Sequence, residues 1–322
     1  MKFSVDAWDP AYGSAFEAEE LAESTAIVDA TMETPSDSWA PVPAAGPVAL
    51  PTSVLFVDGV RRTDARVWID DADATAGGER AVAGLCASYA AGVVRTSGNT
   101  AQVVVAEVRR RLYTEAHTAT HIPTASGEYS VHHVTTSPTQ SVAMALSNAL
   151  QASLLQLEVI VAANARADSQ PEPDDLLVVD GPIREKLDLP RTLGYVKTHS
   201  KYYLPSELNA IVAKLDTAER TPIFSIATGW QRYSWYLRLP CVPAGPWTGV
   251  VRLEASPNIA LDEVIALANV SQALLGRFAS VEYKDSRAPQ NLVPIAGLEN
   301  DLRHRLGASP LLHRALRVAA HA

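Results

Sequence analysis

The chain has 322 residues, of which 47% are hydrophobic and 20% charged, and its formal net charge is −9. This composition is sufficient for a sizeable core in one large domain or two ordinary ones. A protein that binds nucleic acid through charge alone is normally basic, so the net charge at first argues against a DNA or RNA partner. The acidity is local, however, because residues 1–50 carry −8 and leave only −1 for residues 51–322.

Several classes of protein are excluded by motifs. Cys86 and Cys241 form neither a CxxC pair nor a zinc-finger spacing, which is typical of a reducing compartment. No apolar run reaches the roughly 18 residues of a membrane span, and residues 1–10 lack the apolar stretch of a secretory signal. No GxxxxGK[ST] motif occurs. We therefore expect a soluble, cytoplasmic protein that is neither a membrane protein nor a P-loop nucleotidase.

Residues 1–52 differ in character from the rest of the chain. Residues 14–33 are predicted to form an acidic amphipathic helix, and residues 34–52, rich in Pro, Ser and Ala, a linker or extended arm. We expect this segment to lie away from any DNA path, so that removal of residues 1–50 leaves basal activity largely unchanged. The remaining residues, 53–322, are expected to form the functional domain.

Apolar runs and turn residues predict the elements of this domain. A first group of strands with hairpin-like links is expected at 53–57, 66–70, 85–95 and 101–113. Ser137, Pro138 and Gln140 then mark the start of a long helix that reaches about Arg166. The further elements are a buried strand at 176–179, a helix near 205–217, strands near 221–226, 233–239 and 248–254, a helix near 261–279 and one or two C-terminal helices. The order indicates an α/β fold: a mixed sheet with flanking helices and an added C-terminal helical region.

Two Asp-Gly pairs end apolar strands and give the strongest chemical signal. They are Asp58-Gly59 and Asp180-Gly181. An Asp at the carboxyl end of a central strand points into the crevice above the sheet edge, and Gly permits close approach of backbone or ligand. If the two strands are neighbours, their carboxylates converge and supply the hard oxygen ligands that Mg²⁺ or Mn²⁺ requires. A lone Asp-Gly pair is more often a simple turn.

Glu158 is the third candidate carboxylate. It lies beside the apolar stripe of the predicted long helix, where a carboxylate is costly to bury without a cation or a hydrogen-bond donor. The alternative is a flank position from which the side chain reaches water. Strand Asp, helix Glu, then strand Asp is the order found in RNase H-like nucleases, whose carboxylates hold two metal ions about 3.5–4 Å apart.

The chain resembles the NurA family of nucleases. The resemblance runs from about residue 53 to 307 and is carried by FVDGVRR (56–62), QLEVI (156–160), LLVVDGPI (176–183), GYVKTHSKYYLP (194–205), YSWYLRLP (233–240), GVVRLEA (249–255) and PQNLVPIAGLENDLRHRLG (289–307). It implies an RNase H-like fold and a Mn²⁺-dependent (or Mg²⁺-dependent) DNA nuclease. It also implies a homodimer that works with a HerA-type hexameric ATPase in exonucleolytic end resection during double-strand-break repair. The metal ligands implied are Asp58, Glu158 and Asp180, with Lys197 in a supporting catalytic role.

The C-terminal region departs from the family pattern. The family commonly has a Tyr and a His in a proline-containing stretch, whereas this chain has SRAPQNLVPIAGLE with no His there. Tyr283, Glu299 and His304 are nearby candidates for that site, and His304 is the candidate catalytic residue among them.

Basic residues supply candidate DNA contacts. Arg61 and Arg62 follow Asp58, and Lys197 and Lys201 lie in a segment interleaved with tyrosines. Basic and aromatic residues together suit phosphate contacts and base stacking, although a solvated loop with packed tyrosines would have the same pattern. The histidines at 117, 121, 132 and 133 have no Cys or well-spaced acid to complete a metal site, so we interpret them as structural.

Two other functions remain open. Strand-end Asp-Gly pairs also hold Mg²⁺ in actin-like phosphotransferases, but VDGVRR and VDGPIREK are poor phosphate loops. The third possibility is a degenerate, non-catalytic NurA-like protein that serves as a docking partner of an ATPase, which the missing C-terminal His motif favours.

Overall fold

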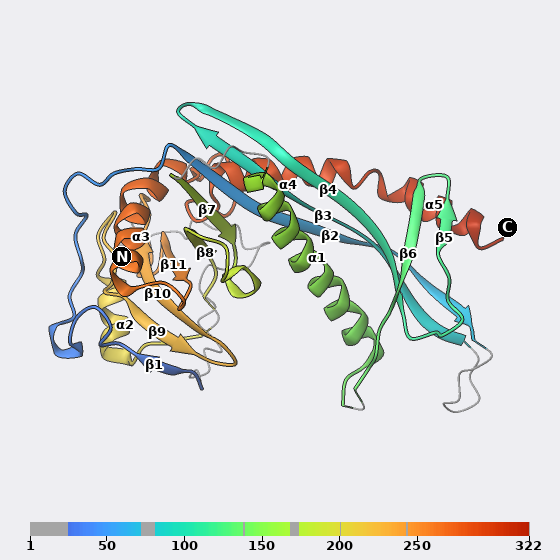
Figure 1. Ribbon diagram of the computed structural model, residues 1–322, viewed down its shortest axis with the longest axis horizontal. Helices are drawn as coiled ribbons and strands as arrows, with labels where there is room; N and C mark the ends of the chain where they lie inside the picture. The colour runs from blue at the N-terminus through green and yellow to red at the C-terminus, as the bar shows by residue number, and fades with distance from the viewer. Residues whose placement is uncertain are drawn as a thin grey trace, which may run out of the picture. The chain divides into compact units, whose positions relative to one another are not determined.

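The computed structural model forms two compact units (Figure 1). It describes residues 25–71, 81–137, 139–167, 174–199, 201–242 and 244–321. Of these, the first unit comprises residues 25–56, 94–102 and 174–296, and the second comprises 57–71, 81–93, 103–137, 139–167 and 297–321. Most of the predicted acidic helix lies outside the described residues.

The first unit is built on a mixed sheet. Its strands are β1 (Ile27–Asp29), β7 (Asp175–Asp180), β8 (Thr192–Val196), β9 (Phe224–Ala227), β10 (Gln231–Arg238), β11 (Val250–Ala255) and the start of β2 (Ser53–Asp70). Their order is β1-β9-β10-β11-β8-β7-β2. Strands β7 and β8 are parallel, whereas β11 is antiparallel to both β8 and β10. The helices of this unit are α2 (Ser206–Ala213) and α3 (Leu261–Leu274), followed by the 3₁₀ turn Leu275–Phe278.

The second unit contains long strands and the longest described helix. Its sheet continues from β2 through β3 (Ala81–Ser97), β4 (Thr100–Thr114), β6 (Gly127–His133) and β5 (Ile122–Thr124), in that order. Its helices are α1 (Val142–Ala167), α5 (Ser309–Ala319) and most of α4 (Val293–Arg305), which begins in the first unit. The mixed sheets with flanking helices and C-terminal helices confirm the predicted α/β class.

Strand β2 corrects the predicted hairpin. Segments 53–57 and 66–70 belong to one continuous strand, because Arg61–Asp64 extends the chain and does not turn it. The first half of β2 is buried on both faces, and the second half alternates between exposed and covered side chains. That change from a continuous apolar run to alternation is typical of a strand that leaves a two-sided core for a one-sided sheet.

Two other local predictions need correction. Helix α1 begins at Val142, where Ser141 Oγ accepts a bond from the Met144 N–H at 3.3 Å, so Ser141 caps it rather than Ser137. Residues 27–29, predicted as the end of an acidic helix, form β1 and pair with β9. Their β-branched Ile27-Val28 pair favours a strand once a partner edge is present.

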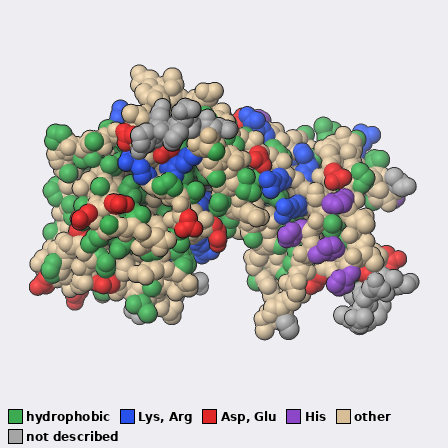
Figure 2. All heavy atoms as spheres, viewed as in Figure 1, with side chains coloured by type: hydrophobic (Ala, Val, Ile, Leu, Met, Phe, Trp, Pro, Cys, Tyr) green, Lys and Arg blue, Asp and Glu red, His purple; other side chains and the backbone are tan. Residues whose placement is uncertain are grey.

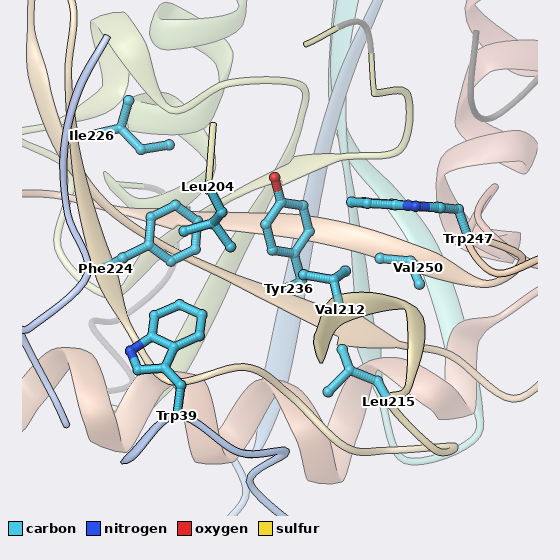
Figure 3. Packing of buried hydrophobic residues seen from close by; sticks show 9 residues of the cluster. All are labelled: Trp39, Leu204, Val212, Leu215, Phe224, Ile226, Tyr236, Trp247 and Val250. Atoms are coloured by element: carbon cyan, nitrogen blue, oxygen red, sulfur yellow. The ribbon is translucent and has the colours of Figure 1, made fainter. Parts of the chain in front are cut away.

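Each unit has its own apolar core. In the first, aromatic rings from several segments pack together around Tyr236, with Trp39, Phe224 and Trp247 (Figure 3). The Tyr236 ring is stacked on that of Phe224 at 5.8 Å and meets that of Trp247 edge-on at 5.5 Å. In the second unit, one apolar cluster consists of Cys86, Leu112, Ala116, Ala119, Tyr129 and Leu316. Trp39 therefore makes the segment ahead of β2 part of the first unit.

Helix α1 is long and apolar enough, by length and composition, to cross a membrane. In its most apolar window, 44% is buried inside the structure, and the core helix of a soluble protein passes the same test. The contacts at Gly59 show its packing against β2, since a Cβ there would lie 2.6 Å from Leu154 Cδ1.

Candidate active site

Asp180 lies at the carboxyl end of β7, beside the parallel strand β8. Lys197 directly follows the last residue of β8, and its Nζ donates a hydrogen bond to Asp180 Oδ2 at 2.7 Å. The two side chains are 16% and 14% exposed, so this ion pair is largely shielded from water. Parallel pairing thus brings the predicted strand-end carboxylate and the predicted lysine together.

Asn291 is a further partner that the sequence did not indicate. Lys197 Nζ also donates to Asn291 Oδ1 at 3.2 Å, and Asn291 Nδ2 donates to Asp285 Oδ2 at 2.7 Å. Asn291 is fully buried. The ammonium group of Lys197 is therefore held between two oxygen acceptors, which fixes its position beside Asp180.

The turn after Asp180 depends on glycine at two positions. Gly181 has φ +94° and its N–H donates to Tyr195 O at 2.8 Å. Across the turn, a Cβ on Gly194 would lie 2.6 Å from Ile183 N, so only glycine permits this close backbone approach. Burial raises the pKa of Tyr195 well above its usual range, and its protonated hydroxyl donates to Gln290 O at 2.6 Å.

A buried ionic network lies beneath the same turn. Glu254 Oε2 accepts a bond from the Ile183 N–H at 3.1 Å. Its Oε1 accepts from Arg232 Nε and from Arg252 Nη2, each at 2.9 Å. Burial by itself lowers the pKa of Arg252, but attraction to Glu254, Tyr236 and Tyr203 and the hydrogen bond to Glu254 together outweigh burial and raise it. Two guanidinium groups share one carboxylate, so the network carries net positive charge.

These groups border a pocket of about 370 Å³ in the first unit. It is lined by Asp180, Gly181, Pro182, Tyr195, Val196, Lys197, Thr198, Lys201, Tyr203 and Arg252. Apart from Asp180, every charged residue of this lining is a cation. The predicted DNA contact Lys201 is exposed at its rim. We call this the cationic pocket.

Asp58 and Glu158 lie in the second unit, on β2 and α1. They are 8% and 5% exposed, so Glu158 is buried and not at a solvent-facing flank. Gly59 N–H donates to Asp58 Oδ1 at 2.7 Å, and a Cβ on Gly59 would lie 2.8 Å from Glu158 Oε1. The helix carboxylate therefore lies against the Asp58-Gly59 step of the strand, and glycine makes the approach possible.

The two arginines after Asp58 have different environments. Arg61 is exposed. Arg62 Nε donates to the buried Asp64 Oδ1 at 2.9 Å, and Arg62 Nη1 donates to Gly307 O at 2.8 Å. Arg62 thus joins β2 to the end of α4, whereas Arg61 is directed to solvent.

The three C-terminal candidates are spread over both units. Tyr283 is 82% exposed in the first unit. Glu299 and His304 belong to α4 in the second, where Glu299 accepts a bond from Arg303 and His304 is exposed.

Among the described residues, no three Asp, Glu, His or Cys side chains stand together as a metal-binding group. The shared site of Asp58, Glu158 and Asp180 stays a prediction, with two carboxylates in one unit and one in the other. Histidine side chains gather over β5 and β6 (Figure 2). There His121 Nδ1 accepts a bond from the Val131 N–H at 3.3 Å, and burial lowers the pKa of His132.

Comparison with known proteins gives structural likenesses only. No family model and no curated protein matches the chain. The structure of the NurA nuclease from Sulfolobus solfataricus is similar, with a TM-score of 0.41 and 10% identity over 83% of this chain and 84% of that one. The catalytic domain of human endonuclease V has a TM-score of 0.36 and 18% identity, over 81% of this chain and 85% of that one. Endonuclease V from Bacillus subtilis has a TM-score of 0.33 and 13% identity, over 80% and 84%. All three TM-scores are below 0.5, so no residue role and no activity is transferred from these structures to this chain.

Proposed function

We propose that this chain is a divalent-metal-dependent DNA nuclease that hydrolyses phosphodiester bonds. The observation that carries the proposal is the environment of Asp180, a strand-end carboxylate that is fixed by Lys197 in a pocket whose other charged residues are all cations. Cationic walls attract the phosphate backbone, and a carboxylate among them supplies the hard oxygen that a divalent ion requires.

The available donors fit Mn²⁺ or Mg²⁺ by their chemistry. Asp58 and Glu158 are two buried carboxyl groups on elements that pack together, and carboxylate oxygens are the ligands that these ions prefer. We infer that Asp58, Glu158 and Asp180 hold the metal. When bound, the ion would stabilise charge on the phosphate and lower the pKa of a water molecule.

The remaining residues act on the substrate or on the carboxylates. Lys197 orients Asp180 through its bond to Oδ2 and offsets the negative charge of the phosphodiester. Arg61 and Lys201 are exposed and contact the phosphate backbone. Arg62 has a mainly structural role because its guanidinium bonds Asp64 and Gly307.

The biological setting is inferred from the sequence resemblance. We assign the chain to exonucleolytic end resection in double-strand-break repair, in the cytoplasm, as a homodimer with a HerA-type hexameric ATPase. Exposed His304 is the nearest histidine in sequence to the family's C-terminal Tyr/His site and its candidate substitute.

DNA digestion in Mn²⁺ tests the proposal. We expect wild-type protein to degrade DNA, and Asp180→Asn to lower the rate about 100-fold or more, since one ligand and its charge are lost. Lys197→Met should lower it by about 10- to 100-fold. The matched control is Asp216→Asn, which removes an exposed carboxylate of the same unit outside the pocket.

Unchanged digestion by folded Asp180→Asn protein would contradict the assignment. Binding of an ATPase without DNA cleavage by wild-type protein, in either Mn²⁺ or Mg²⁺, would instead identify a non-catalytic docking partner.

A further inference from the structure

A second pocket adjoins the cationic pocket in the first unit. It has a volume of about 680 Å³ and is lined by Ala26, Val28, Ala30, Tyr202, Tyr203, Leu204, Pro205, Ser206, Asn209, Ala210 and Trp247. Tyr203 lines both pockets, so they meet at its side chain. We call the second one the aromatic groove. Its volume lies in the range of about 300–1,000 Å³ that is usual for small-ligand sites.

The two pockets differ sharply in chemistry. None of the residues that line the aromatic groove carries a charge, and three of them are aromatic: Tyr202, Tyr203 and Trp247. The rings of Tyr202 and Trp247 lie 6.0 Å apart, and Trp247 belongs to the apolar core that forms the floor (Figure 3). Small side chains beside β1 and on α2, among them Ala26, Ala30 and Ala210, line the rest of the groove.

The Tyr203 ring, which lines the aromatic groove, also contacts the guanidinium groups of two arginines. The guanidinium carbon of Arg252 lies 4.6 Å from the centre of the Tyr203 ring, and that of Arg232 lies 5.6 Å from it. Arg252 is 5% exposed and yet lines the cationic pocket, together with Lys197 and Lys201. Three cationic side chains around one pocket favour an anionic ligand there.

The cationic pocket suits a phosphate, and the aromatic groove suits a base that stacks on its rings. Because the two share Tyr203, together they match the phosphate and the base of one nucleotide. We propose that a single-stranded segment of nucleic acid lies across Tyr203, with a phosphate in the cationic pocket and an unpaired base in the aromatic groove. The inference deepens the proposed nuclease function by naming the substrate class, and it rests on that function. A base in a duplex is stacked and paired, so only an unpaired strand or a frayed end can place its base in the groove.

The test compares two oligonucleotides with the same number of phosphates, one of thymidine and one abasic. Their binding to the full chain is measured by fluorescence anisotropy in EDTA, which prevents metal-dependent cleavage. We expect wild-type protein to bind oligothymidine about tenfold or more tightly than the abasic strand, because base stacking on aromatic rings adds to phosphate contacts. Ala210→Trp fills the groove from an exposed helix position and should remove this preference while leaving abasic binding unchanged.

Thr217→Trp is the matched control, because it adds the same side chain at an exposed position outside the groove. Equal affinity of wild-type protein for both strands, or an unchanged preference in Ala210→Trp, would overturn the inference and leave the groove to another partner, such as a peptide.

Parallel digestion in Mn²⁺ separates the two proposals. Cleavage without a base preference refutes the groove assignment alone, whereas a groove-dependent preference without cleavage refutes the nuclease assignment alone.

Discussion

His199 is a buried histidine that the proposed reaction does not use. It is 4% exposed, its Nε2 lies 3.0 Å from Val250 O, and its ring packs against those of Tyr236 and Trp247. Burial lowers its pKa to about 4, so the neutral form is present in the folded protein at neutral pH. The Nε2 proton is then donated to the carbonyl of Val250.

This histidine predicts a pH dependence of stability. Its folded pKa lies below the unfolded value of about 6.5, so between pH 6.5 and 4 the unfolded chain binds more protons. The free energy of unfolding should therefore fall as the pH is lowered through that window, by up to about 3 kcal/mol. In His199→Phe, urea unfolding at pH 7 and pH 4.5 should show a smaller difference than in wild type. An equal difference would refute the prediction, and His313→Phe, an exposed substitution, is the control.

At the scale of elements, the sequence predicts the strand that carries Asp180 well and its surroundings poorly. The run LLVVDG predicts β7, because continuous apolar residues followed by Asp-Gly are typical of a buried strand and its end. The pattern does not indicate β8, since its five residues follow a largely charged stretch and their burial depends on pairing with β7 and β11. The sequence therefore indicates a catalytic role for Lys197 only through the family resemblance. Its contact with Asp180 is visible only in the structure.

The Glu254 network was also missed, although a local signal existed. Arg232, Arg252 and Glu254 are charged residues inside apolar strands, and such residues are rarely buried unless they are paired. Sequence alone does not say which of them pair, because their contacts depend on the register of β10 with β11.

A substitution at Gly194 tests how tightly β8 packs against the turn that follows Asp180. A methyl group at this position would meet the backbone N of Ile183, which cannot move as a flexible side chain does. We expect Gly194→Ala to displace the turn after Asp180, to destabilise the protein by about 1–3 kcal/mol and to reduce DNA cleavage. Thermal unfolding and digestion measure the two effects. Gly229→Ala, where a Cβ meets nothing within 4 Å, should alter neither, and an unperturbed Gly194→Ala would show that the turn is looser than described.

At the scale of the whole molecule, the segment before β2 is part of the fold. Strand β1 pairs with β9, Trp39 packs into the core, and Glu33 binds Arg220 through both oxygens at 2.7 and 2.8 Å. Removal of residues 1–50 would take all three away, so the expectation that this segment is dispensable needs revision. Much of the net charge of −9 lies in this segment, where Glu33 at least has a structural role.

The Glu33–Arg220 pair gives a direct test of that role. The two side chains are 14% and 2% exposed, and Glu33 also accepts a bond from the Ile223 N–H. Since Glu33→Gln leaves Arg220 buried without its counter-charge, we expect a loss of about 3–5 kcal/mol in the free energy of unfolding. Urea denaturation measures it. Glu207→Gln, an exposed substitution on α2, should change stability little, and an equally small effect of Glu33→Gln would mean that the arm is not anchored there.

The proposed nuclease depends on a divalent metal, for which we propose Asp58, Glu158 and Asp180 as ligands. The most direct measurement is anomalous diffraction from crystals of the full chain grown with Mn²⁺. We expect manganese bound by the carboxylate oxygens of Asp58, Glu158 and Asp180, at about 2.0–2.2 Å, the distance expected for a small divalent ion. Manganese bound elsewhere, with Asp180 still paired only to Lys197, would contradict it.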